Sequence, residues 1–345
     1  MDTTLNKENT LGTAWGRFVA ALHGAMDART VAAWGIGQAQ TSGTMTVVPI
    51  FGAQHTGFAA PGAGVRLKQV HTYGDVELEC PGDAEGLAIV PLHMGFVQHG
   101  AQNHALCGSA LIEPGKSVRF KDARCVQAAQ GGLLEGRDQW FFVLPLGLRV
   151  AALDQIGHNG YNQLWGAIEE LNASFGLPKR GHLEQILTKQ RAVLTQFRSR
   201  FECMDGQTGA LFFVGDRLAG VEIAPSSVYF RDIWMPLAAF AYGVAAHGIE
   251  RSGAKGLYGT GEPFTAIASL ADLRDALRDA RAEREDTLAT IISASSAGLA
   301  GAKRTAVARH GKTATTLETV KASGFAGQVV KRDGEPVYVS LFRTR

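Results

Sequence analysis

The sequence predicts an α+β protein, with a β-rich N-terminal lobe followed by a mixed lobe of helices and hairpins. Over residues 44–150, short apolar stretches are bounded by glycine, proline and aspartate, which is typical of strands. The period then changes to that of amphipathic helices, over 161–175 and 184–201. Two later stretches, 209–223 and 327–342, turn at Gly-Asp or Asp-Gly, which predicts hairpins.

These elements divide the chain into three stretches of one continuous unit. Residues 1–43 carry a lead-in and an N-terminal helix, 44–155 form the β-rich lobe, and 156–345 form the mixed lobe with a linker near 249–268. Apolar residues recur at helical spacing over 11–26, and this pattern predicts the N-terminal helix.

The mixed lobe is expected to hold two further helices. One is rich in aromatic residues and covers 228–247. The other is charged and covers 269–286, beginning with a capping-box pattern at Ser269. Residues 287–317 contain no acid and are rich in Ala, Ser and Gly, which favours a basic flexible connector over a phosphate-binding segment.

Composition excludes several classes of protein. With 46% hydrophobic and 19% charged residues, the 345-residue chain is globular rather than disordered. A net charge of +2 gives no reason to expect nucleic acid as a partner, and no apolar run is long enough to cross a membrane. The four cysteines form no C-x-x-C pair and the polar N-terminus lacks a secretory pattern, so we expect a cytoplasmic protein with reduced thiols.

One stretch, "ALIEPGKS" at residues 110–117, ends like a phosphate-binding P-loop. A P-loop leads from a strand into the N-terminus of a helix, but the residues after Ser117 alternate as a strand does. Pro114 and Gly115 are typical turn residues. The stretch therefore predicts a β-hairpin with Lys116 at its exposed end.

Three segments, residues 90–127, 208–247 and 325–342, together resemble the ARG and rhodanese-phosphatase-superfamily-associated protein domain. The family's Gln-Asn pair corresponds to Gln102-Asn103, and its Cys-Val pair to Cys125-Val126. This chain has His104 where the family usually has arginine, Gln127 where it usually has an acid, and no acidic stretch before the Gln-Asn pair. The resemblance implies a role in ADP-ribose or related nucleotide metabolism and implies no catalytic residue.

Gln102, Asn103, His104 and Glu222 are the candidate ligand-binding residues. Amides offer paired donors and acceptors, imidazole changes charge near neutral pH, and a carboxylate can bind a ribose hydroxyl. Each also has a structural alternative, in a turn or as a helix cap. Cys125 would be a nucleophile only beside a base, so a buried structural thiol is favoured.

A metal site would use His93, His99, His104 and Cys107, but their spacing matches no zinc motif, and we expect neither metal nor cofactor. The leading hypothesis is a cytoplasmic protein that binds, and in its stronger form also processes, an ADP-ribose-like or other nucleotide-derived ligand. The alternatives are a non-catalytic protein-interaction module, which would accommodate self-association, and a metal-dependent hydrolase.

Overall fold

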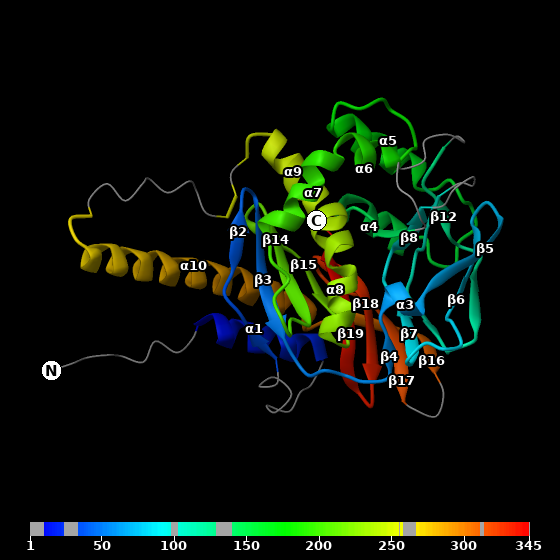
Figure 1. The fold of residues 1–345 in the computed structure, drawn as a ribbon, viewed down its shortest axis with the longest axis horizontal. Coiled ribbons are helices and arrows are strands. Elements are labelled where there is room, and N and C mark those ends of the chain that lie inside the picture. The colour runs from blue at the N-terminus through cyan, green and yellow to red at the C-terminus, as the bar shows by residue number, and fades with distance from the viewer. Residues whose placement is uncertain are drawn as a thin grey trace.

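The centre of the protein is a large antiparallel sheet (Figure 1). The computed structural model describes residues 10–23, 34–97, 103–128, 140–254, 256–257, 267–310 and 314–344. The strands of this sheet are β1 (Gly35–Ile36), β2 (Gln40–Ser42), β3 (Met45–Phe51), β14 (Gly209–Val214), β15 (Arg217–Ile223), β16 (Lys303–His310), β17 (Thr315–Lys321), β18 (Phe325–Arg332) and β19 (Glu335–Arg343). Within the described residues their order is β1-β3-β14-β15-β19-β18-β17-β16, and β2 also pairs with β3. The sheet therefore draws strands from both ends of the chain.

Both predicted hairpins are confirmed. β14 and β15 pair across Gly215, whose φ of 62° is the left-handed conformation that glycine adopts without a Cβ clash. β18 and β19 pair across Asp333 and Gly334, which both have positive φ. Two consecutive residues with positive φ match the twist of a two-residue hairpin, and Asp-Gly is a preferred pair for that turn.

Two helices, α1 (Thr10–His23) and α10 (Leu270–Leu299), cover one face of the sheet (Figure 1). Trp15 and Phe18 of α1 are buried against this face. We expected the charged helix to end at residue 286, but α10 continues to Leu299 because Leu288, Ile292 and Leu299 are buried against the sheet. The N-terminal part of α10 projects beyond the body of the protein.

The prediction that residues 287–317 form a flexible connector was wrong. Lys303–His310 forms β16, the edge strand of the sheet, paired in antiparallel register with β17. The strand is exposed along most of its length, so its Ala- and Arg-rich sequence lacks the apolar alternation that marks a strand. Backbone pairing with β17, whose Leu317 and Val320 are buried, holds it in the sheet.

Most of the remaining helical elements pack against the other face of the sheet. The remaining elements are α4 (Leu146–Leu153), α5 (Trp165–Ser174), α6 (Glu184–Lys189), α7 (Arg191–Arg200), α8 (Ser227–Met235), the π-helical turn η1 (Pro236–Tyr242) and α9 (Gly243–Arg251). Of these, α4, α7, α8, η1 and α9 pack against the sheet, whereas α5 and α6 pack beside the small sheet that contains β8 (Met94–Val97) and β9 (His104–Ala105). The segment expected to be one helix over 184–201 breaks at Gln190 into α6 and α7. The aromatic-rich helix is confirmed and runs past Gly248.

The helical run from α8 to α9 changes pitch at Pro236. Proline lacks the N–H that an α-helix needs at this point, and the chain widens into a π-helical segment, η1. All seven residues of η1 are buried, and the ring of Tyr242 stacks on Phe212 of β14 at 4.1 Å between ring centroids. This segment thus brings the Tyr242 side chain to the centre of the sheet.

Three small sheets complete the N-terminal half. Their elements are β4 (Phe58–Ala59), the short helix α3 (Pro61–Gly64), β5 (Arg66–Thr72), β6 (Asp75–Glu79), β7 (Leu87–Val90), β8 (Met94–Val97), β9 (His104–Ala105), β10 (Ala110–Ile112), β11 (Ser117–Phe120), β12 (Arg124–Cys125) and β13 (Trp140–Val143). They pair in the orders β10-β7-β4, β11-β6-β5 and β12-β9-β8-β13. The whole is an α+β fold with a β-rich N-terminal region, as the sequence predicted.

The P-loop-like stretch forms a turn between two strands, and no helix begins there. Gly115 has a φ of 74°, and the Lys116 N–H donates to the Glu113 carbonyl at 3.0 Å. The hairpin prediction was nevertheless wrong, because β10 pairs with β7 while β11 pairs with β6. The turn passes the chain between two sheets, and Lys116 is exposed on it.

No helix in the described part of the chain is both long enough and apolar enough to cross a membrane.

Candidate functional site

Two short stretches that the family resemblance singles out, one at Asn103 and one at Cys125-Val126, lie side by side. β9 pairs with β12 so that His104 faces Cys125 across the ladder. The Val126 N–H donates to the Asn103 carbonyl at 3.0 Å, and the Asn103 N–H donates to Gln127 Oε1 at 3.3 Å. Residues 103–104 and 125–127, predicted separately from the sequence, therefore form one structural unit.

Of the predicted ligand residues in this unit, Asn103 and His104 are buried. Nε2 of His104 accepts a hydrogen bond from the Gly74 N–H at 3.1 Å, so the neutral ring carries its proton on Nδ1. His104 thus has a structural role, because its ring holds the β5–β6 turn against β9. Gln102 and His99 lie outside the described residues.

A third segment, residues 180–184, joins this unit. Gln127 forms an isolated antiparallel bridge with His182, and the Leu183 N–H donates to the Val126 carbonyl at 2.9 Å. The Asn172 side chain on α5 donates to the carbonyls of Arg180, at 2.6 Å, and His182, at 3.1 Å. These hydrogen bonds fix His182 beside residues 125–127, and Glu184 follows at the start of α6.

Glu184 and His182 form a close pair of titratable side chains. Oε1 of Glu184 lies 3.0 Å from Nδ1 of His182. Both Glu184 oxygens are buried and neither has an aligned hydrogen bond among the described residues, although the main-chain N–H of Glu184 lies close enough to favour the ionised form. Burial raises the pKa of Glu184 to about 8 and lowers the pKa of His182, which the nearby Arg180 lowers further. Near neutral pH the carboxyl thus holds its proton and the imidazole is uncharged.

Cys125 is fully buried at the centre of the unit. Its Sγ lies 3.1 Å from the Gln127 carbonyl oxygen. Burial raises the pKa of the thiol, so the reactive thiolate is disfavoured at neutral pH. This supports the structural role that the sequence favoured for Cys125.

An aromatic row borders the same unit. The rings of Tyr73 and Tyr161 lie 5.3 Å apart between centroids, and those of Tyr161 and Trp165 lie 5.7 Å apart. Tyr73 is 50% and Tyr161 is 37% exposed. The row is tied to β12, because the Trp165 indole N–H donates to the Cys125 carbonyl at 3.0 Å and the Cys125 N–H donates to the Tyr161 carbonyl at 2.8 Å. Exposed aromatic faces of this kind can stack on planar ligands.

The sequence did not identify the aromatic row, His182 or Glu184. The only local signal for the acid–base pair is the short stretch "GHLE", in which a histidine and a glutamate flank a buried leucine. We name the motif cluster as Asn103, His104, Cys125, Gln127, His182 and Glu184, and the aromatic row as Tyr73, Tyr161 and Trp165.

Glu222, the remaining predicted ligand residue, has a separate set of partners. It lies on β15 at 1% exposure, and its Oε1 accepts hydrogen bonds from Arg149 Nη1 and from the Tyr242 hydroxyl, both at 2.7 Å. Nη2 of Arg149 donates to the Ser340 hydroxyl at 2.6 Å. Because Glu222 and Ser340 face each other on adjacent strands, Arg149 of α4 clamps the centre of the sheet.

His93 connects the clamp to the motif cluster through packed side chains. Its Nδ1 lies 3.4 Å from the Leu106 carbonyl oxygen, just after β9, and its ring lies 5.5 Å from the ring of Phe342. The Arg149 guanidinium contacts the same Phe342 ring, 4.5 Å from its centroid. Whether Glu222 and His104 both contact one ligand stays a prediction.

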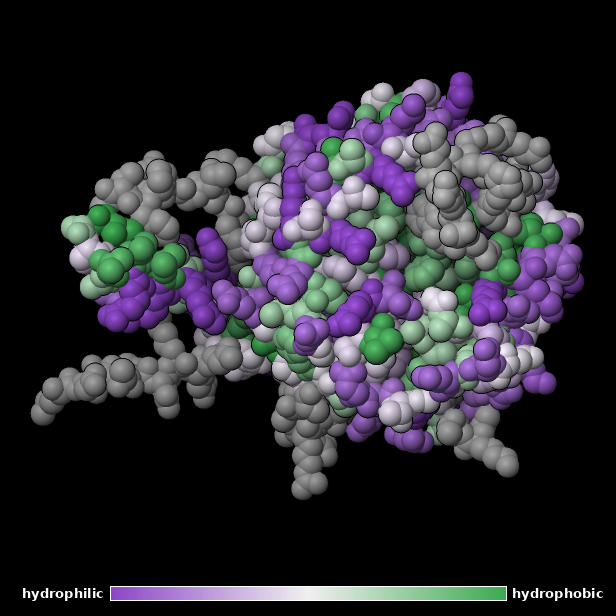
Figure 2. Space-filling model, in the orientation of Figure 1, coloured by the Kyte–Doolittle hydropathy of each residue, from purple (hydrophilic) through white to green (hydrophobic). Residues whose placement is uncertain are grey.

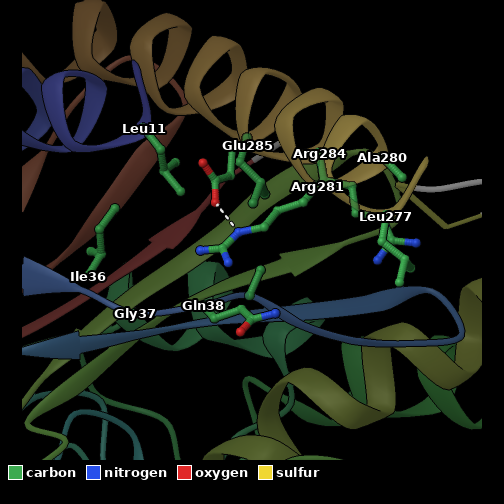
Figure 3. A pocket seen from close by; sticks show the side chains of 11 residues that line it. Leu11, Ile36, Gly37, Gln38, Leu277, Ala280, Arg281, Arg284 and Glu285 are labelled. Atoms are coloured by element: carbon green, nitrogen blue, oxygen red, sulfur yellow. Dashed lines mark hydrogen bonds and ion pairs between the residues drawn. The ribbon is translucent and has the colours of Figure 1, made fainter. Parts of the chain in front are cut away.

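Several surface pockets among the described residues lie elsewhere, including the following two. The first, of about 450 Å³, lies beneath α10 and is partly bridged by the Arg281–Glu285 ion pair (Figure 3). It is lined by Leu11, Ile36, Gly37, Gln38, Ala39, Leu277, Ala280, Arg281, Arg284, Glu285 and Leu288. The second, of about 620 Å³, lies between β4, α3 and the start of α8, and includes His55, Phe58, Arg66 and Ser226. Neither contains the predicted ligand residues.

A metal centre has no support in the described residues, where no three His, Cys, Asp or Glu side chains converge as metal ligands would. His93 is fully buried, and burial lowers its pKa well below the usual value.

Comparison with known proteins gives one finding. The family model for the ARG and Rhodanese-Phosphatase-superfamily-associated Protein domain matches residues 34–342. Neither the curated proteins nor the solved structures contain a match. The match begins before β1 and ends at the last strand of the central sheet, so it covers the sheet, the motif cluster and the aromatic row alike. The chain therefore belongs to the ARG and Rhodanese-Phosphatase-superfamily-associated Protein domain family.

Proposed function

We propose that the protein binds an ADP-ribose-like, nucleotide-derived ligand at the motif cluster, with the base of the ligand stacked on the aromatic row. The observation that carries the proposal is the assembly of both family segments beside exposed aromatic rings. Asn103 and Gln127 place two buried amide side chains in the cluster, where Gln127 Oε1 accepts from the Asn103 N–H, and Tyr161 and Trp165 supply planar faces. Nucleotide recognition commonly combines stacking with a few directed hydrogen bonds.

Electrostatics favours an uncharged recognition surface for the ribose rather than a phosphate site in the cluster itself. The Glu184 carboxyl and the His182 imidazole are both neutral near pH 7, because burial raises the pKa of Glu184 to about 8 and lowers that of His182. Neutral donors and acceptors can bind hydroxyl groups without the cost of desolvating a charge. The cytoplasmic location expected from the sequence stays a prediction.

The binding test is calorimetric titration of the purified protein with ADP-ribose. Removing one stacking ring should cost about 1–3 kcal/mol, so Tyr161→Ala should weaken binding at least about fivefold. Val228→Ala, which shortens a side chain that is 65% exposed on α8, serves as the control and should leave the affinity unchanged. An affinity for ADP-ribose that Tyr161→Ala does not change would place the ligand elsewhere.

A second candidate function, protein interaction, rests on the free end of α10. Leu270 is 85% and Leu277 is 50% exposed there, and Figure 2 shows hydrophobic residues gathered at this projecting end. Exposed apolar groups on a projecting helix are typical of interaction surfaces. Sedimentation of wild type and of Leu270→Glu/Leu277→Glu tests it, since loss of a self-associated species in the variant would support this function.

A further inference from the structure

The pocket of about 620 Å³ beside α3, which we name the α3 pocket, is built from segments that lie far apart in the sequence. The His55 N–H donates to the Pro225 carbonyl at 2.7 Å. The Ser227 N–H donates to Gln54 Oε1 at 2.8 Å. These bonds fasten the chain before β4 to the start of α8. The volume of the pocket lies within the range of small-molecule sites.

A second set of contacts holds the chain around β4 against the loop before β7. The Leu87 N–H donates to the Gly57 carbonyl at 3.0 Å. Gly86 has a φ of 152°, and a Cβ there would lie 2.3 Å from the Gly57 carbonyl oxygen, so this close approach requires glycine. The Arg332 guanidinium lies 3.8 Å from the centroid of the Phe58 ring. The α3 pocket is therefore formed before a ligand arrives, which lowers the conformational cost of binding.

Charged side chains of both signs line the α3 pocket without pairing with one another. Arg66 begins β5, whereas Asp83 and Glu85 lie in the loop between β6 and β7. All three are exposed, and none forms an ion pair with another described residue. Burial lowers the pKa of His55, so its imidazole adds no charge near neutral pH. The pocket thus presents one cation and two carboxylates to a ligand.

These charges and the rest of the lining select a class of ligand. A guanidinium can pair with a carboxylate through two parallel hydrogen bonds, and carboxylates accept strong hydrogen bonds from an ammonium group. The excess of negative charge disfavours phosphates. Phe58 and the small side chains of Ala59, Ala60 and Ala63 add apolar surface. A zwitterion that carries an apolar group matches all of these features.

We propose that the α3 pocket binds a free α-amino acid with an apolar side chain. The carboxylate of the amino acid pairs with Arg66, and its ammonium group pairs with Asp83 and Glu85. Its side chain packs on Phe58 and the alanines. This site is separate from the motif cluster, so the inference does not depend on the proposed nucleotide ligand.

The test is calorimetric titration of the full-length protein with L-leucine and L-phenylalanine. Each is compared with the amine that lacks its carboxylate and with the acid that lacks its ammonium group. A charge-assisted hydrogen bond contributes about 1.5–3 kcal/mol, and solvent exposure of these side chains reduces that value. At least one amino acid should therefore bind about tenfold more tightly than either of its analogues.

Variants assign each charged group of the ligand to its partner. Arg66→Gln should weaken amino-acid binding to the level of the amine and leave binding of the amine unchanged, whereas Arg66→Lys should restore part of the loss. Asp83→Asn/Glu85→Gln should weaken amino-acid binding to the level of the acid. Arg198→Gln and Glu170→Gln change the same charges at exposed positions on α7 and α5, and they should match wild type. Circular dichroism checks that each variant is folded.

Three results would overturn the inference. One is the absence of heat from both amino acids at concentrations up to about 10 mM. Another is equal affinity for an amino acid and its amine, which would make the pocket a simple cation site. The third is amino-acid binding that Arg66→Gln and Asp83→Asn/Glu85→Gln leave unchanged, because the amino acid would then bind elsewhere.

Discussion

Replacing Glu184 with glutamine should make the stability of the protein less dependent on pH. In the folded protein, burial raises the pKa of this carboxyl from 4.5 to about 8. Because the folded state binds the proton more tightly than the unfolded chain, the resulting stabilisation is complete below the unfolded pKa and is lost as pH rises toward the folded pKa. The window therefore runs from about pH 4.5 to about pH 8.

The magnitude follows from the size of the shift. One pKa unit corresponds to about 1.4 kcal/mol, so wild type should lose about 3 kcal/mol from this group between about pH 5 and about pH 8. Glu184→Gln cannot ionise and should not lose it. The variant should therefore gain about 3 kcal/mol relative to wild type across this range.

Urea unfolding at several pH values, followed by tryptophan fluorescence, measures this difference directly. Glu170→Gln removes an exposed carboxyl of the neighbouring helix α5 and should give a constant offset from wild type. Free energies of unfolding for Glu184→Gln and wild type that run parallel from pH 5 to pH 8 would refute the reasoning. That outcome would mean that Glu184 is ionised in the folded protein and has a partner or solvent to compensate it.

Three other predictions test the clamp, the motif cluster and the turn. Arg149→Met should destabilise the protein by about 3–5 kcal/mol in urea unfolding, because Glu222 is left buried and unpaired, while Arg149→Met/Glu222→Gln should cost less than the single change. Gln102→Ala should weaken ADP-ribose binding about tenfold in calorimetry with little change in melting temperature, whereas His104→Ala should cost about 1–3 kcal/mol of stability by leaving the Gly74 N–H unpaired. Lys116→Ala should leave ATP affinity unchanged in the same titration.

Local chemistry explains which parts of the fold the sequence predicts. The turns of both hairpins are specified by Gly215 and by Asp333-Gly334, whose backbone conformations few other residues adopt. Similarly, Pro114-Gly115 specifies a turn, but a turn does not say which strands pair on either side of it. The pairing of β10 with β7 and of β11 with β6 depends on contacts between segments distant along the chain.

The segment after residue 286 shows where local patterns fail. Its Ala, Ser and Gly content is typical of a connector, yet Leu288, Ile292 and Leu299 are buried and extend α10 to the sheet. β16 is exposed on most positions, so no apolar alternation marks it. In both cases packing and backbone pairing within the folded chain outweigh the preference of the segment itself.

The candidate site was predictable only in part. The sequence identified Asn103 and His104 by residue type and by family resemblance, and the structure places them against residues 125–127. The pairing with residues 180–184 could not be foreseen, because the bridge between Gln127 and His182 spans more than fifty residues of intervening chain. Glu222 was predicted as a ligand residue from its place at the end of an apolar strand, but a sequence does not reveal that Arg149 lies opposite it.

Hydrogen exchange measured by mass spectrometry, with and without ADP-ribose, tests the proposed binding site most directly. Bound ligand should slow exchange in peptides that cover residues 103–105, 124–127, 161–165 and 181–184, which are far apart in sequence and together in the structure. Peptides from the two surface pockets, such as residues 54–60 and 277–285, should exchange as they do in the free protein. Protection confined to either pocket, or no protection at saturating ADP-ribose, would contradict the assignment of the motif cluster as the nucleotide site.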